Sequence, residues 1–147
     1  MVVCVAMGNS LRGDDGVAQR ALQLIAPGGH VRLRQVCQLT PELAAEIAIA
    51  GADTVFFLDA DPSSTETTLE PVEPRSTRGT PLAHSMSPAE VLELTRRLYG
   101  FAGEAFLCRI PAKYFEHGEG LSPQAEAGAH AAAKMIQQRI AASFTIS

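Results

Sequence analysis

The sequence predicts an α/β fold: a three-layer α/β/α sandwich whose twisted, mostly parallel sheet of about five strands carries helices on both faces. Short apolar runs bounded by Gly, Pro or Asp alternate along the chain with segments whose apolar residues recur at helical spacing. The run at 54–58 is apolar almost throughout, as in a central strand covered on both faces. Because the sequence contains no repeat and no linker, we expect residues 1–147 to form a single domain.

Five segments have the composition of strands. The segment 31–36 alternates apolar and polar residues, which is typical of a half-exposed strand. The segment 68–72 lies in a stretch rich in Pro, Ser and Thr, so we expect a short edge strand there. The expected strands are 2–7, 31–36, 54–58, 68–72 and 105–110.

Four segments between these strands are expected to be helices. Thr40 and Pro41 supply an N-cap hydroxyl and a Pro at the first helical position. The sequence at 87–90, Ser-Pro-Ala-Glu, combines such a Pro with a capping box. The last helix has a face of small residues, mostly Ala, that favours close packing. The four helices are expected to follow Gly16, Thr40, Ser87 and Ser122.

Composition excludes several classes of partner and location. The chain has 12 basic and 16 acidic residues, a net charge of −4, and no Trp, so it offers neither a basic face nor a stacking ladder for nucleic acid. Its first residues lack the basic region and the long apolar segment of a signal peptide, and no apolar stretch approaches the ~18 residues of a membrane span, so we expect neither. We therefore expect a soluble cytoplasmic protein, and a monomer, with no nucleic-acid or membrane partner.

The three cysteines point to the same compartment. Cys4, Cys37 and Cys108 are odd in number and share no CxxC spacing, and each lies in or beside an apolar run. We expect all three to be buried, reduced thiols.

A glycine-rich segment between the first strand and the first helix ends in two adjacent carboxylates, Asp14 and Asp15. Both could simply cap the helix, whose N-terminus carries a partial positive charge. One carboxylate is enough for that, however, so the second is free to point into the crevice beside the loop. The segment lacks both G-x-G-x-x-G and the Lys-Ser/Thr ending of a phosphate loop, and two carboxylates would repel a phosphate. The sequence therefore favours a loop that presents oxygen ligands to a cation.

Three chemically able side chains fall where ligands bind in open α/β sheets, outside the carboxyl ends of the strands. Asp15 follows the first strand, Asp59 follows the third expected strand, and His84 lies in the loop before the Ser87 helix. Two carboxylates and one imidazole suit a borderline divalent ion held with open coordination positions. The alternatives are structural: Asp59 could simply be the residue that ends a strand, and His84 could be an ordinary surface histidine.

The segment Gly8-Asn9-Ser10-Leu11-Arg12-Gly13-Asp14-Asp15-Gly16 resembles the signature of the nickel–iron hydrogenase maturation endopeptidases, which remove the C-terminal extension of the hydrogenase large subunit. The resemblance extends through most of the chain. Further matching segments are 39–43 in the second loop, 58–60 at the end of the third strand, 84–88 in the histidine loop and 118–123 before the last helix.

This resemblance implies a metal-dependent endopeptidase acting on the hydrogenase large-subunit precursor. Asp15, Asp59 and His84 correspond to the family's nickel-contacting residues, and Asp14 to a residue that caps or orients the loop. The nickel arrives with the substrate, since the precursor is cleaved only once its metal is in place. Three ligands without a thiolate would hold free metal weakly and would discriminate little between metals. Zn or Cd is therefore expected to substitute in vitro. The segments 61–83 and 113–120 flank the expected crevice and are expected to be mobile and to grip the precursor.

Two other functions are consistent with parts of the pattern. A phosphorelay receiver domain also has an acidic pair after its first strand, an Asp ending its third, and a Lys after its last, where Lys113 stands here. A receiver's acids follow its first strand directly, however, whereas a glycine-rich loop intervenes in this chain. The second alternative is a nickel-sensing scaffold that binds the precursor without cutting it.

Overall fold

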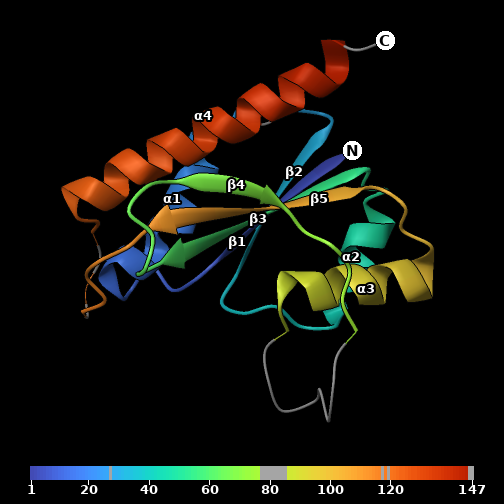
Figure 1. The fold of residues 1–147 in the computed structure, drawn as a ribbon, viewed down its shortest axis with the longest axis horizontal. Coiled ribbons are helices and arrows are strands. Elements are labelled where there is room, and N and C mark those ends of the chain that lie inside the picture. The colour runs from blue at the N-terminus through green and yellow to red at the C-terminus, as the bar shows by residue number, and fades with distance from the viewer. Residues whose placement is uncertain (27, 77–85, 117, 119, 146–147) are drawn as a thin grey trace.

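The computed structural model describes residues 1–26, 28–76, 86–116, 118 and 120–145 (Figure 1). Its strands are β1 (Val2–Met7), β2 (Val31–Val36), β3 (Thr54–Asp61), β4 (Thr68–Pro71) and β5 (Glu104–Pro111). Its α-helices are α1 (Val17–Leu24), α2 (Glu42–Ile49), α3 (Pro88–Tyr99) and α4 (Pro123–Thr145), and a 3₁₀ turn, η1, spans Gly13–Gly16.

The sheet has the strand order β2-β1-β3-β5-β4. Neighbouring strands are parallel except β4, which pairs antiparallel with β5 at one edge. After β1 the chain adds β2 on one side and then β3 on the other, so the order of addition reverses between β1 and β3. In open α/β sheets this reversal creates a crevice at the carboxyl ends of the two strands. The expected five-stranded, mostly parallel sheet is confirmed.

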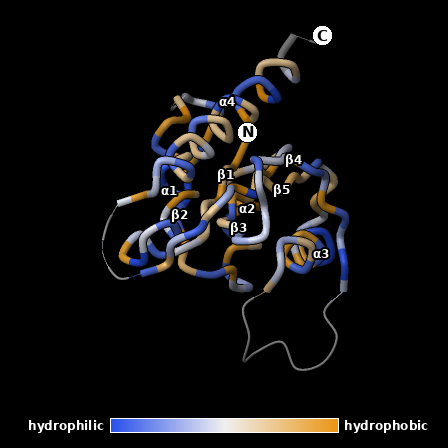
Figure 2. Tube along the Cα trace, turned by 60° about the vertical axis from the view of Figure 1, so that its left-hand side comes forward, coloured by the Kyte–Doolittle hydropathy of each residue, from blue (hydrophilic) through white to orange (hydrophobic). Residues whose placement is uncertain are grey.

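Two apolar cores lie on opposite faces of the sheet. Alternate residues of β1 point to each face: Val2, Cys4 and Ala6 pack with α1 and α4, whereas Val3 and Val5 pack with α2 and α3. Figure 1 shows α1 and α4 on one side of the strands and α2 and α3 on the other. In Figure 2 the apolar colours run along the strands between these helical layers. Residues 55–58 of β3 are buried, which confirms the expected strand covered on both faces, and all six residues of β1 are buried as well.

The long helix α4 packs closely because its buried face is made of small side chains. Ala125, Ala129 and Ala132 are fully buried and belong to the same core as α1. Beside them, the rings of Phe56 and Phe106 stack with centroids 5.4 Å apart. Small residues let the helix axis approach the sheet, so the Phe side chains of the strands fill the remaining space.

Several local expectations are corrected. Helix α2 begins at Glu42 without a side-chain cap from Thr40, and its first turn is closed by backbone hydrogen bonds instead. Strand β3 continues to Asp61, because pairing with β5 extends as far as Pro111. Cys37 is exposed, since it lies just past the end of the edge strand β2, whereas Cys4 and Cys108 are buried. Burial raises the pKa of both these thiols to about 12.

The capping chemistry expected for α3 is present in full. The Ser87 hydroxyl accepts a hydrogen bond from the Glu90 N–H, and the Glu90 carboxylate accepts one from the Ser87 N–H. Pro88 occupies the first position of the helix. Within the described part of the chain, no helix has the length and apolar character needed to cross a membrane.

Removing the Ser87 hydroxyl should therefore destabilise the protein measurably. We expect Ser87→Ala to lower the free energy of unfolding by about 1 kcal/mol, because the Glu90 N–H loses its partner. Urea denaturation measures the loss. Ser87→Thr, which keeps the acceptor, is the control, and an equal loss in both variants would show that the cap contributes nothing.

Candidate functional site

Two close backbone approaches shape the loop after β1, one within the loop itself and one against the loop after β5. Gly8 has φ +134°, and a side chain there would put its Cβ 2.1 Å from the carbonyl oxygen of Asp15. Gly13 has φ +56°, and its Cβ would lie 2.6 Å from the carbonyl oxygen of Tyr114. Both positions require glycine for its backbone freedom and its lack of a side chain. The glycines of the motif thus fold the first loop back on itself and against Tyr114 and Glu116.

Asp14 joins these two loops to the start of α4. Its Oδ2 accepts hydrogen bonds from the Lys113 N–H at 2.8 Å, the Tyr114 N–H at 3.2 Å and the Ser122 hydroxyl at 2.8 Å. Its Oδ1 accepts from the Ser122 N–H at 2.8 Å. The residue is fully buried. Burial raises the pKa of this carboxyl, but the four donors together outweigh burial and hold the pKa below its usual value.

This arrangement corrects the expected role of Asp14 as a helix cap. Neither η1 nor α1 has a side-chain cap, so Asp14 does not cap the helix that follows it. It instead fixes Ser122, whose hydroxyl accepts from the Ala125 N–H and caps α4. The expected role in orienting the loop is confirmed, although the partners lie about 100 residues away along the chain.

The Asp15 carboxylate points elsewhere. Its Oδ2 accepts a hydrogen bond from the Asn9 N–H at 2.8 Å, across the first loop, and the residue is half-buried. None of the four groups that donate to Asp14 donates to Asp15. The two adjacent acids therefore divide as expected, one inside the structure and the other at the edge of the loop where β1 ends.

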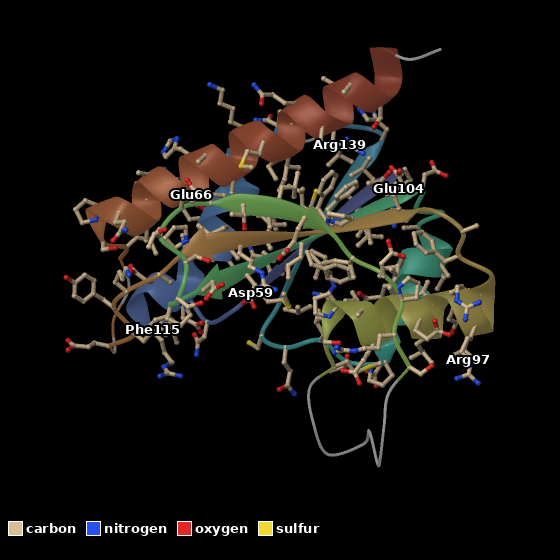
Figure 3. All side chains as sticks on the ribbon, in the orientation of Figure 1. Asp59, Glu66, Arg97, Glu104, Phe115 and Arg139 are labelled. Atoms are coloured by element: carbon tan, nitrogen blue, oxygen red, sulfur yellow. The ribbon has the colours of Figure 1, made fainter. Side chains whose placement is uncertain are left out.

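Asp59 lies on β3, the strand beside β1 at the reversal of strand order (Figure 3). Burial raises the pKa of its carboxyl, and the negative charges of Asp15 and Asp61 raise it further. The Ala60 N–H and the Arg109 guanidinium lower the pKa but do not offset burial. The turn η1, which carries Asp15, packs against β3, so the fold brings Asp15 and Asp59 to the same edge of the sheet.

Asp61, two residues further along β3, has the opposite electrostatic environment. Its carboxylate accepts hydrogen bonds from the Ser63 N–H at 2.9 Å, the Ser63 hydroxyl at 2.7 Å and the Ser64 hydroxyl at 2.8 Å. These donors, together with Arg109 at 3.5 Å, lower the pKa of Asp61 to about 2. Asp61 is committed to a local turn, whereas Asp59 is not.

The third expected site residue, His84, lies outside the described residues, as does the segment 77–85 around it. The chain after it is anchored, because the Met86 N–H donates a hydrogen bond to the Leu39 carbonyl at 3.1 Å. Leu39 follows β2, whose carboxyl end lies at the same edge of the sheet as that of β1. Among the described residues, no three His, Cys, Asp or Glu side chains form a cluster that could hold a metal ion.

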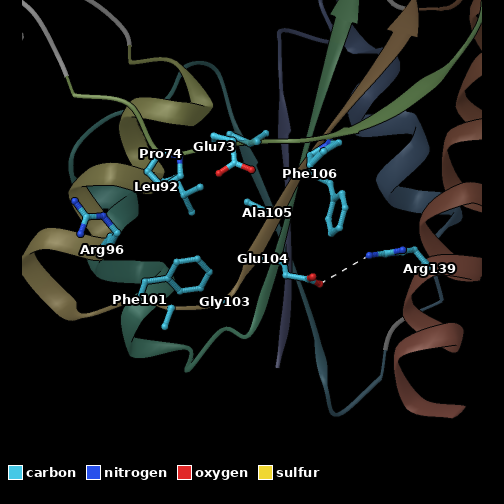
Figure 4. A pocket seen from close by; sticks show the side chains of 13 residues that line it. Glu73, Pro74, Leu92, Arg96, Phe101, Gly103, Glu104, Ala105, Phe106 and Arg139 are labelled. Carbon is cyan, nitrogen blue, oxygen red and sulfur yellow. Dashed lines mark ion pairs between the residues drawn. The ribbon is translucent and has the colours of Figure 1, made fainter. Parts of the chain in front are cut away.

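A hollow of about 470 Å³ lies away from these carboxylates, where β5 begins (Figure 4). Its charged groups are partly paired: Arg139 lies 3.9 Å from Glu104 and 4.7 Å from the centre of the Phe106 ring. Neither Asp15 nor Asp59 lines it. It is therefore separate from the candidate site.

No protein-family model matches the sequence, and no curated protein matches it significantly. Solved structures do match the fold. The hydrogenase maturation protease HycI from Thermococcus kodakarensis KOD1 superposes with a TM-score of 0.71 at 20% identity, over 93% of this chain and 90% of that one. The maturating endopeptidase HybD from E. coli gives a TM-score of 0.69 at 20% identity, over 97% and 94%. A hydrogenase 2 maturation peptidase from a Thaumarchaeota archaeon gives 0.66 at 20%, over 95% and 97%.

The chain thus has the fold of the solved hydrogenase maturation proteases. The resemblance noted in the sequence motifs extends to the arrangement of strands and helices over nearly the whole length of each chain. A receiver domain is excluded by topology, because its parallel sheet follows the order 2-1-3-4-5, whereas here β4 is an antiparallel edge strand beyond β5.

Asp14→Asn should destabilise the protein strongly. Both carboxylate oxygens accept from backbone N–H groups, so the amide NH₂ would face a donor whichever way the side chain is turned. We expect a loss of about 2–4 kcal/mol in the free energy of unfolding at neutral pH. Because folding lowers the pKa of Asp14, the advantage of the parent should shrink as the pH falls below about 4.

The matched control is Asp53→Asn, which removes an exposed carboxylate paired with the N-terminal amine at 2.9 Å. Its effect should stay below about 1 kcal/mol. Equal stability of the Asp14 and Asp53 variants in urea denaturation would contradict the role given to Asp14.

Proposed function

We propose that this protein is an endopeptidase that removes the C-terminal extension of a nickel-loaded hydrogenase large-subunit precursor. Asp15, Asp59 and His84 recognise the nickel that the precursor carries. The observation that carries the proposal is the placement of Asp15 and Asp59 at the β1/β3 reversal, in a fold shared with maturation proteases. The sequence resemblance around residues 8–16 supports the same function.

The electrostatics of Asp59 suit a carboxylate that meets a cation. In the protein alone, burial and two neighbouring negative charges disfavour its ionised form. A divalent ion beside it would reverse both effects, since a cation favours the charged carboxylate and screens Asp15 from Asp59. A half-buried pair of acids of this kind is poised to complete the coordination of a metal held mainly by the substrate.

Each residue has a distinct part in the proposed reaction. Asp15 and Asp59 supply oxygen ligands and His84 an imidazole, leaving positions for the substrate's own ligands and for water. The substrate's nickel provides Lewis-acid chemistry at the scissile carbonyl or at a bound water. Asp14 acts through position alone, by holding the loop that carries Asp15. We expect Zn²⁺ or Cd²⁺ to replace nickel in vitro, and we expect the reaction to occur in the cytoplasm.

Asp59→Asn should separate function from stability. At neutral pH the charged Asp59 opposes folding, because its pKa is raised in the folded protein. We therefore expect the variant to melt no lower than the parent, yet to leave nickel-loaded precursor uncut on a gel. Asp15→Asn should also be inactive, and it should melt within a few degrees of the parent.

The control is Asp61→Asn, on the same strand. Since folding lowers the pKa of Asp61 to about 2, its loss should reduce stability while cleavage continues. Cleavage by all three variants would refute the carboxylate site. Tight binding of the precursor by the parent without any loss of mass would instead indicate a nickel-sensing scaffold.

Metal binding should depend on pH through His84. The purified protein should bind Ni²⁺, Zn²⁺ or Cd²⁺ with modest affinity, which calorimetry can measure, and binding should weaken below about pH 6 as the imidazole protonates. His84→Ala should bind metal more weakly at pH 7.5 and lose most of this pH dependence. An affinity of the parent that is constant between pH 5 and 8 would exclude an imidazole ligand.

A further inference from the structure

A second hollow, of about 400 Å³, lies directly behind the loop that carries Asp15. It is bounded by the first loop, α1, the end of β2 and the chain just before α4. Three glutamines line it: Gln19 and Gln23 from successive turns of α1, and Gln35 from β2. We refer to it as the amide hollow, after these side chains.

The amide hollow carries almost no unpaired charge. Its two ionised side chains, Arg20 and Glu126, form a forked ion pair, with Nε and Nη2 donating to Oε1 at 3.0 and 2.9 Å and Nε donating to Oε2 at 3.2 Å. The pair is half-exposed on both sides. A phosphate or carboxylate ligand would have to break it, so the chemistry of the hollow favours an uncharged, polar occupant.

Glutamine side chains have one acceptor and two donors, which matches the C=O and N–H groups of a peptide backbone. Gln19 uses one N–H on the Gly8 carbonyl at 2.8 Å, and the Gln23 Oε1 accepts weakly from Arg20 at 3.4 Å. The side chain of Gln35 is exposed on the same face of β2 as Val31 and Leu33. These amides can donate to the carbonyl groups and accept from the N–H groups of an extended chain, whichever way that chain runs.

Beside the lining residues of the hollow, the chain carries an exposed apolar side chain on a backbone held by hydrogen bonds. Leu11 lies between two lining residues, Ser10 and Gly13, and 58% of its surface is exposed. Its N–H donates to the Asn9 Oδ1 at 3.0 Å, and its carbonyl accepts from the Gly118 N–H at 2.8 Å. The backbone is thus fixed on both sides of an exposed apolar group, which reduces the entropy lost when a partner covers it.

We propose that the amide hollow is a peptide-binding subsite that holds an extended, uncharged segment of the polypeptide substrate, with Leu11 as its apolar contact. The inference rests on the proposed function, because it makes the segment part of the precursor that is cleaved. Gly13 and Gly16, at the two ends of η1, line the hollow, and Asp15 lies between them in the chain. A segment seated in the hollow therefore needs only to pass over the first loop to reach Asp15.

The test uses Gln35→Glu and Leu11→Ser, alone and combined. Both side chains are exposed, so the variants should melt like the parent. The added carboxylate should repel the substrate's carbonyl groups, and the Ser should remove the apolar contact. We expect the double variant to raise KM for nickel-loaded precursor at least about fivefold with kcat little changed. It should weaken the binding of a fluorescent peptide spanning the cleavage region, measured by anisotropy without metal, by a similar factor.

Matched controls are Gln138→Glu on α4 and Ile49→Ser on α2, whose side chains are also exposed but do not line the hollow. Both should behave like the parent. An unchanged KM and unchanged peptide binding in the double variant, with cleavage intact, would overturn the subsite and leave the proposed function standing. If the parent does not cleave the precursor but the double variant still loses peptide binding, the proposed function fails and the subsite stands.

Discussion

The rest of this structure depends on the hydrogen bonds accepted by the buried carboxylate of Asp14. Its four hydrogen bonds join the loop after β1, the loop after β5 and the N-terminus of α4. These segments come from opposite ends of the sequence, and each bears on the candidate site. The Ser122 hydroxyl passes the effect on to α4 by capping its first turn. Asp15 follows Asp14 directly in the chain, so the hydrogen bonds of Asp14 also fix where Asp15 lies.

The acids around the site also show how a fold separates structural from reactive groups. Asp14 and Asp61 are surrounded by donors, which lower the pKa of each and make its charge favourable to folding. Asp59 is half-buried, and its charge is opposed by burial and by neighbouring acids. A protein gains no stability from such a group at neutral pH. Carboxyl groups with a shifted pKa in a crevice are characteristic of functional sites. The proposed subsite, the amide hollow behind Asp15, lies on the face of the sheet opposite to α2 and α3.

Much of the fold could be predicted because its signals are local. Apolar runs predicted the strands, and the capping box at Ser87–Glu90 predicted where α3 begins. Even the edge position of β4 followed from the surrounding Pro, Ser and Thr residues. The errors arose where tertiary contacts overrule local preference: β3 extends to Asp61 because β5 pairs with it, and Cys37 is exposed because β2 is an edge strand.

Spacing and composition over a few residues were enough to predict the fold class and the alternation of strands and helices. They also predicted that Asp15 follows the first strand and that Asp59 lies near the end of the third, which continues two residues further to Asp61. The family resemblance in the sequence assigned Asp15 to the metal and Asp14 to the loop. The donors that surround Asp14 lie about 100 residues away, so only the folded chain shows what Asp14 holds together. The folded chain also shows that its surroundings raise the pKa of Asp59 and lower the pKa of Asp61, because desolvation and hydrogen bonding depend on what packs nearby. Partners brought together from distant parts of the chain leave no local pattern from which they could be predicted.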